Sequence, residues 1–231
     1  KMEVFQETKE IHEVTVMKKR MEIKKLFIWF FVCLLIFVFS TFLHECGHGL
    51  SSQMNGVPVS TGFNRVGNVY SFPGDARTGF EDTQSFLLDF GVPVTLFLTI
   101  VFTIVLCTKK RWGSFSAFVI AGFSLCNSII RLVPCLISVI SSLLTQTLHM
   151  EDEIQTGQLL ATQTGIGWLL ALPAIISIIV SIVCLVLSLR KCRTIEYLHF
   201  KGIWIAFCAA YVVSFVMENY LDTVIRINWI V

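Results

Sequence analysis

The sequence Leu26-Phe27-Ile28-Trp29-Phe30-Phe31 opens an apolar stretch that continues to Leu43 and ends in His44-Glu45-Cys46-Gly47-His48. Residues four apart lie on one face of a helix, so the imidazoles of His44 and His48 can reach one zinc ion. Glu45 is then placed to act as general base on a water activated by that metal. Ionisable side chains inside a membrane helix are costly and usually functional. The stretch therefore predicts a metal centre within a transmembrane helix.

The same five residues have a simpler interpretation. A polar helix end at the membrane interface would also carry histidines, which would cap the helix or reach towards water. Cys46 points off the face of the two histidines, so we interpret it as a buried thiol rather than a ligand. Gly47 is interpreted as a small packing residue that lets another helix approach.

The composition is that of an integral membrane protein. The chain is 55% hydrophobic, with a mean hydropathy of +0.74, against roughly 45–50% apolar residues in soluble domains. Its net charge is only +2, so nucleic-acid binding is not expected. No Cys-x-x-Cys pair occurs, and free thiols are expected because five of the eight cysteines lie in apolar segments: Cys33, Cys126, Cys135, Cys184 and Cys208.

The hydropathy pattern divides the chain into a polar tail, residues 1–25, and a membrane-embedded region, residues 26–231. Apolar runs near or above the roughly 20 residues that span a bilayer indicate the helices. The fold class is thus an all-α polytopic membrane protein with about five transmembrane helices and a small β-hairpin after the first. The expected helices cover about 26–53, 86–107, 115–144, 166–189 and 203–216 or beyond.

The hairpin is expected within the glycine-rich segment 55–85. Apolar and β-branched residues alternate through Val57, Val59, Thr61 and Phe63, and Val69-Tyr70 follows a Gly-Asn pair. Alternation with a period of two indicates a strand, and Gly-Asn is a hairpin-turn signal. We expect the first strand to be an edge strand.

Basic residues predict the orientation in the membrane. They concentrate in segments 109–111 and 190–193, whereas the loop 146–165 contains no lysine or arginine. The positive-inside rule then places the N-terminus in the cytoplasm and the C-terminus outside. With five crossings, the histidines and the acidic segment 150–153 fall on the same outer side.

A catalytic zinc usually has three protein ligands and an open position. Asp152 is the first choice for the third ligand, followed by Glu151 and Glu153, because this acidic segment follows the third helix on the face of the histidines. A solvated acidic loop is the alternative interpretation. Glu218 and Asp222, four apart near the end of the fifth helix, are further candidates or interfacial charges.

Two polar residues interrupt the apolar third helix, Asn127 and Arg131. Asn127 could hydrogen-bond a substrate carbonyl or a developing oxyanion, or join two helices. A buried arginine needs an anionic partner, which Asp89 or the segment 151–153 could supply. For Arg131 we favour a structural role.

Three sequence elements together resemble the site-2 protease family of intramembrane zinc metalloproteases. They are His44-Glu45-Cys46-Gly47-His48, the Gly-Pro element Phe90-Gly91-Val92-Pro93-Val94, and the stretch from Asn127 to Leu132-Val133-Pro134. The similarity covers about residues 26–152. The family's Asp-Gly-Gly segment, which supplies an aspartate ligand, is missing after Pro134, and Asp152 takes that role here by position.

The resemblance implies that residues 26–231 form a membrane-embedded metalloprotease domain. Its cofactor would be Zn²⁺ and its partners a membrane-protein substrate and the lipid bilayer. Glu45 would exchange the proton of the attacking water, and the strand at 57–63 would hold an unwound substrate by strand addition. The alternatives are a membrane metal-ion transporter, or a non-catalytic membrane protein with a structural metal. Substrate identity and oligomeric state stay open.

Overall fold

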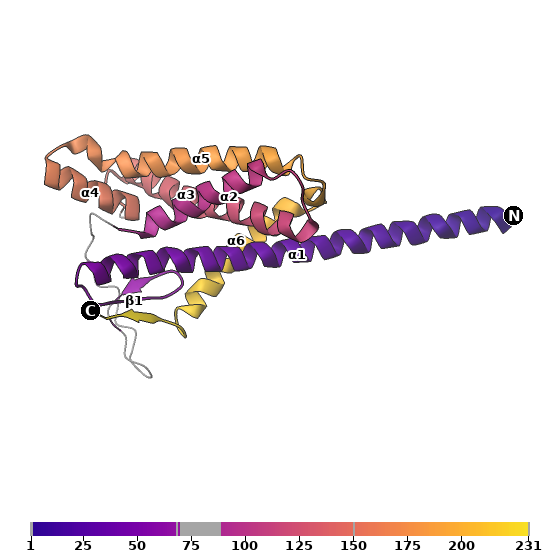
Figure 1. Cartoon of the computed structure of the whole chain (residues 1–231), viewed down its shortest axis with the longest axis horizontal. Coiled ribbons are helices and arrows are strands. Elements are labelled where there is room, and N and C mark those ends of the chain that lie inside the picture. Colours follow the sequence, from indigo (N-terminus) through magenta and orange to yellow (C-terminus); the bar gives the residue numbers. More distant parts are fainter. Residues whose placement is uncertain (1, 68, 70–88, 150, 231) are drawn as a thin grey trace.

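The computed structural model describes residues 2–67, 69, 89–149 and 151–230. Six α-helices, two 3₁₀ turns and a small sheet make up this part of the chain (Figure 1). In chain order the elements are α1 (Met2–Met54), β1 (Val59–Thr61), β2 (Val66–Gly67), α2 (Gly91–Thr108), α3 (Ser114–Thr145), α4 (Asp152–Thr164), η1 (Gly167–Leu170), α5 (Leu172–Cys192), η2 (Glu196–Leu198), α6 (Ile203–Leu221) and β3 (Ile227–Trp229).

The long helix α1 is apolar on both its inner and its outer face. Trp29, Cys33 and Phe37 recur every four residues and are fully buried. The Trp29 ring lies 5.8 Å from that of Phe118 on α3, and Phe37 lies 5.4 Å from Phe207 on α6. The outer face exposes Phe27, Phe31, Leu35 and Phe39. A helix that is hydrophobic all round is one that is buried in protein or in a membrane.

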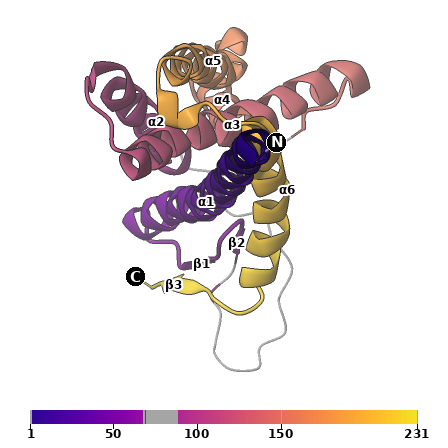
Figure 2. The same cartoon turned by 90° about the vertical axis from the view of Figure 1, so that its right-hand side faces the viewer.

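The helices form a bundle around α1. Figure 2 shows α1 near the centre, with α2, α3 and α5 on one side, α6 beside it, and the sheet on the opposite side. Five helices are long and apolar enough to cross a membrane: Lys19–Met54 within α1, α2, α3, α5 and α6. The predicted all-α polytopic fold class is confirmed. All eight cysteines are free, as expected.

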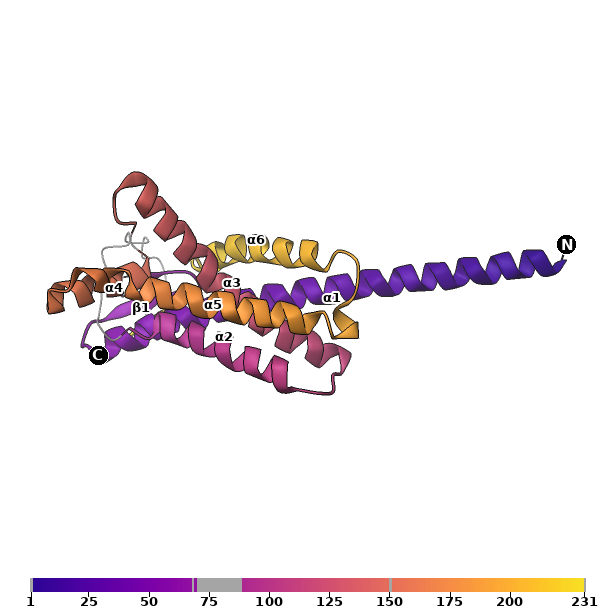
Figure 3. The ribbon, with the colours of Figure 1, turned by 90° about the horizontal axis from the view of Figure 1, so that it is seen from above.

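The N-terminal part of α1 differs from the expected first helix. Helix α1 already begins at Met2, so the segment 2–25 is helical and continuous with the membrane-spanning part. Figures 1 and 3 show this extension projecting beyond the rest of the bundle. The short connections between α2 and α3 and between α5 and α6, which carry most of the loop lysines and arginines, lie at the end of the bundle from which it projects.

The predicted hairpin exists, but its turn and its exposure were predicted wrongly. Strand β1 pairs antiparallel with β2 through Thr61 and Val66, so the chain turns at residues 62–65. Tyr70, expected in the second strand, lies outside the described residues. On its other side β1 pairs with β3, which the sequence did not suggest. Because β1 is the central strand, the expected strand addition to an edge at 57–63 is wrong.

We expected residues 146–165, which include the acidic segment, to form a loop. In the structure most of this region is helix α4. Helix α4 begins at Asp152, with Glu153 also in its first turn, and ends at Thr164, where the following Gly165 adopts a φ of 72°. Carboxylates stabilise the positive N-terminal end of a helix, and glycine accepts the left-handed conformation that ends it. The first residues of the next apolar run form η1. Helix α5 therefore begins at Leu172, later than the expected start at Ile166.

The orientation can be tested with single cysteines introduced into a cysteine-free chain. Lys110 lies at the basic end of the bundle, and Gln163 is exposed on α4. We expect K110C to be labelled by an impermeant thiol reagent from the cytoplasmic side only, and Q163C from the outer side only, because cationic loops are retained in the cytoplasm. Labelling of both from the same side would contradict the five-crossing arrangement.

Candidate metal centre

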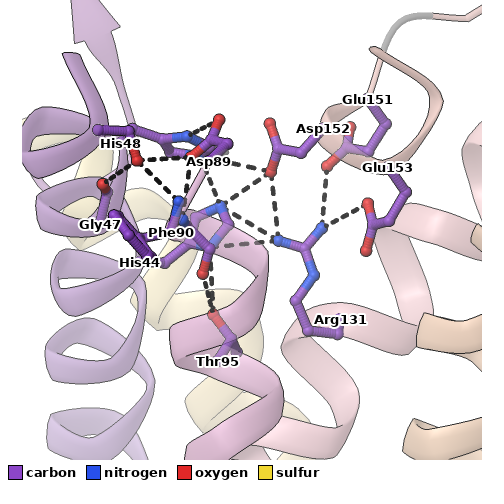
Figure 4. A network of polar contacts seen from close by, with 12 residues as sticks. His44, Gly47, His48, Asp89, Phe90, Thr95, Arg131, Glu151, Asp152 and Glu153 are labelled. Carbon is purple, nitrogen blue, oxygen red and sulfur yellow. Dashed lines mark hydrogen bonds and ion pairs between the residues drawn. The ribbon is translucent and has the colours of Figure 1, made fainter. Parts of the chain in front are cut away.

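Two histidines of α1 and one aspartate of α4 bring their donor atoms together. His44 Nε2 lies 2.9 Å from Asp152 Oδ2 and 3.1 Å from His48 Nε2, and His48 Nε2 lies 3.5 Å from Asp152 Oδ2 (Figure 4). One donor atom from each residue can therefore share a single metal ion. The three residues that the sequence favoured as ligands are brought to one place, although 108 positions separate His44 from Asp152.

A carboxylate orients the second histidine. His48 Nδ1 lies 2.7 Å from Oδ2 of Asp89, which immediately precedes α2. The other oxygen of Asp89 accepts a hydrogen bond from the backbone N–H of Gly91 at 3.0 Å. Burial raises the pKa of Asp89, but the hydrogen bond and charge of His48 outweigh it, so this pKa is lowered. Metal-binding histidines commonly donate their other ring N–H to such a carboxylate.

A threonine orients the first histidine. The hydroxyl of Thr95 lies 3.1 Å from His44 Nδ1 and also donates to the Gly91 carbonyl at 3.2 Å. Because that hydroxyl proton is used by Gly91, its oxygen is free to accept the proton of His44 Nδ1. This assignment leaves a lone pair on His44 Nε2, which faces Asp152 Oδ2 and the Nη1 group of Arg131.

Two glycines allow α1 to approach the start of α2. A Cβ atom at Gly47 would lie 2.7 Å from the backbone carbonyl carbon of Phe90. A Cβ atom at Gly91 would lie 2.4 Å from His48 Nε2. Gly47 is therefore the packing residue that the sequence suggested, and Gly91 leaves room for the imidazole. Cys46 is half-buried and is not among the clustered donors of the described residues.

Arg131 of α3 lies against the centre. Its Nη1 is 3.1 Å from His44 Nε2 and 3.4 Å from Asp152 Oδ2. Its Nη2 is 3.1 Å from Glu153 Oε2 and 3.5 Å from Glu151 Oε1. We expected either Asp89 or the acidic segment 151–153 to pair with Arg131, and the structure shows the acidic segment.

The acidic residues differ in their protonation. Burial, followed by the charge of Asp152, raises the pKa of Glu151 to about 7. Burial acts on Asp152 in the same direction, but the charge of His48 and the hydrogen bonds from both histidines hold its pKa well below the usual range. Asp152 is therefore the ionised carboxylate at the histidines.

The contacts of Glu45 and Asn127 do not test the roles predicted for them. Glu45 is buried with 7% exposure, and no hydrogen bond or ion pair within the described residues fixes its carboxylate. Asn127 is fully buried and donates to the Phe123 carbonyl of its own helix at 2.8 Å, while its Oδ1 has no partner in the described part of the chain. The general-base role of Glu45 and the substrate role of Asn127 stay predictions.

The two alternative ligands, Glu218 near the end of α6 and Asp222 just after it, lie elsewhere. Asp222 accepts hydrogen bonds from the backbone N–H groups of Phe63 and Asn64 and forms an ion pair with Arg65. It therefore secures the turn of the hairpin. Neither Asp222 nor Glu218 belongs to a group of clustered metal donors among the described residues.

Thr95 was not predicted from the sequence, which suggested Asp89 only as one possible partner of Arg131, whereas Asp89 contacts His48. Thr95, Thr99 and Thr103 recur every four residues on α2, and all three are buried. Polar residues with helical periodicity in an apolar segment are a signal that could have indicated a functional face. The contact between Asp89 and His48 depends on tertiary packing and has no such local signal.

The fold and the site together define a multi-pass membrane protein with a candidate metal centre of two histidines and an aspartate. Comparison with known proteins gives no match: neither a protein-family model, nor a curated protein, nor a solved structure is similar to this chain.

The close approach at Gly91 makes the centre sensitive to one methyl group. We expect Gly91→Ala to displace the His48 imidazole and to lower the affinity for a divalent metal about 10-fold or more, while the protein stays folded. Gly167→Ala is the matched control, because a Cβ atom there would meet nothing within 4 Å. Metal titration of both purified variants measures the effect, and equal affinities would contradict it.

Proposed function

We propose that this chain is a zinc-dependent intramembrane endopeptidase that cleaves transmembrane or membrane-proximal segments of membrane proteins. The observation that carries the proposal is the triangle of His44 Nε2, His48 Nε2 and Asp152 Oδ2, formed within a bundle of membrane-spanning helices. The resemblance to site-2 proteases through Glu45, the Gly-Pro element and Asn127 supports the same activity.

The donor atoms suit zinc in kind and in spacing. In a tetrahedral site with bonds of about 2.0–2.1 Å, neighbouring donor atoms lie about 3.3 Å apart. The three distances here, 2.9, 3.1 and 3.5 Å, bracket that value. Two nitrogens and one carboxylate oxygen also match the ligand set of catalytic zinc sites that leave one position open. The contacts of Asp89 and Thr95 give both histidines the required orientation.

The residues would divide the chemistry of hydrolysis among them. Zinc, when bound, supplies Lewis acidity that makes water a nucleophile at neutral pH. Glu45 accepts the proton of that water and returns it to the leaving amine of the cleaved peptide bond. Thr95 and Asp89 hold the imidazoles in place through both steps. Asn127, with a buried amide on α3, is the candidate to contact the substrate carbonyl.

The rival functions receive less support from the site. A transporter needs successive sites along its path, but the two groups of candidate donors in the described residues share Asp152 and so form one location. A structural metal would not require the glutamate that follows His44. Hydrolysis uses both features, the single centre and Glu45.

A single substitution separates binding from catalysis. Glu45→Gln keeps the size of the side chain but removes its ability to accept a proton, so we expect zinc content to stay at the wild-type level and cleavage to fall at least about 100-fold. Cleavage is measured by mapping new N-termini in membrane proteins incubated with the zinc-loaded enzyme in liposomes.

Glu196→Gln, an exposed substitution outside the centre, is the matched control and should cleave as wild type does. The same new termini in the Glu45→Gln sample would overturn the role of Glu45. Zinc flux into the liposomes without proteolysis would favour a transporter instead.

A further inference from the structure

Helix α4 contributes its first turn to the centre. It is a short, polar helix that packs mainly on α5 and η1 and less extensively on α2. At Gly157 it approaches η1 so closely that a Cβ atom would lie 2.0 Å from the Leu170 carbonyl oxygen. Asp152 occupies the first position of this helix. Whether its carboxylate meets the histidines therefore depends on what holds the first turn of α4.

Arg131 is the cation that meets this first turn from α3. Its guanidinium is planar and rigid, so fixing one nitrogen also fixes the other. Nη2 lies 3.1 Å from Glu153 Oε2, and Nη1 lies 3.4 Å from Asp152 Oδ2 (Figure 4). A single side chain thus joins the buried carboxylate of Glu153 to the candidate ligand.

The ion pair between Arg131 and Glu153 is buried, so desolvation of both groups lowers the stability of the fold. The two side chains are only 2% and 0% exposed. Arg131 Nε and Glu153 Oε1 have no hydrogen-bond partner within the described residues. Burying charges with incomplete pairing disfavours folding, and ionisable groups within a membrane bundle are usually retained for function. A role in positioning the neighbouring metal ligand would explain why this unfavourable burial is retained.

We propose that Arg131 is a positioning residue, which holds Asp152 at the metal centre by clamping the first turn of α4 through Glu153. The inference rests on the metal site of the proposed function. It assigns Arg131 a task beyond the structural role expected from the sequence. Without its guanidinium, Asp152 and Glu153 lose the group that joins them, and the metal keeps only the two histidines as protein ligands.

Metal affinity tests the clamp without reference to proteolysis. We expect Arg131→Gln, in the purified full chain, to lower zinc affinity about 10- to 100-fold, the usual effect of losing an outer partner of a ligand. Asp152→Ala should lower it at least as much. If Arg131 acts through Asp152 rather than through its own contact with His44 Nε2, the double variant should be no weaker than Asp152→Ala alone. Arg65→Gln, which loses a different arginine–aspartate pair, is the control and should bind as wild type does.

Cobalt supplies a readout that general destabilisation would not produce. The visible absorption of bound Co²⁺ reports its coordination, so the spectrum of Arg131→Gln should match that of Asp152→Ala and differ from that of wild type. Wild-type zinc affinity in Arg131→Gln, or additive losses in the double variant, would overturn the clamp. If Arg131→Gln does not fold, Glu153→Gln takes its place, and wild-type affinity in that variant would likewise overturn it.

The two proposals fail in different ways. A wild-type protein that binds zinc and shows the expected losses, but cleaves no membrane protein, overturns the protease and supports the clamp. A protein that cleaves, and in which Arg131→Gln binds zinc as wild type does, overturns the clamp alone. A wild-type chain that binds no zinc overturns both.

Discussion

The positions of the other residues in the centre depend on the contact between His44 Nε2 and Asp152 Oδ2, at 2.9 Å. Charged and polar groups within a membrane bundle are tolerable only when they satisfy one another. His44 therefore needs Thr95 behind it, and Asp152 needs a counter-charge, which Arg131 supplies. Each of these partners comes from a different helix, so one polar contact fixes the relative placement of α1, α2, α3 and α4.

Small residues make this convergence sterically possible. Gly47 brings the backbone of α1 against the start of α2, and Gly91 gives the His48 ring the space it occupies. Apolar packing then closes the opposite end of the bundle, where the indole N–H of Trp29 donates to the Ile203 carbonyl at 3.1 Å. The apolar end stabilises the bundle through buried apolar area, whereas the metal centre at the other end is held by directional hydrogen bonds and ion pairs.

The parts that could be predicted are those whose signal is local. The apolar runs predicted the five spans, and the alternation around Val59 predicted the hairpin. The pairing of β3 with β1 was not predictable, because a three-residue strand far along the chain carries no periodicity that names its partner. Helix α4 was overlooked because its polar composition resembles a loop, although its acidic first turn and Gly165 were present. Asp152 was predicted from its order in the chain, while the contact of Asp89 with His48 arises only from packing.

The carboxylates of the centre are more exposed than His44 and Arg131. The side chains of Asp152 and Asp89 are 25% and 22% exposed, whereas those of His44 and Arg131 are 7% and 2% exposed. Further along α1, towards the basic end, the inner face is closed by Phe37. The more exposed donors therefore lie towards α4 and the start of α2. From His44 a buried row of hydroxyls continues along α2 through Thr95, Thr99 and Thr103 to Ser124 and Ser188. The proposed hydrolysis needs access for water from one side, and the partly exposed carboxylates of Asp152 and Asp89 supply it.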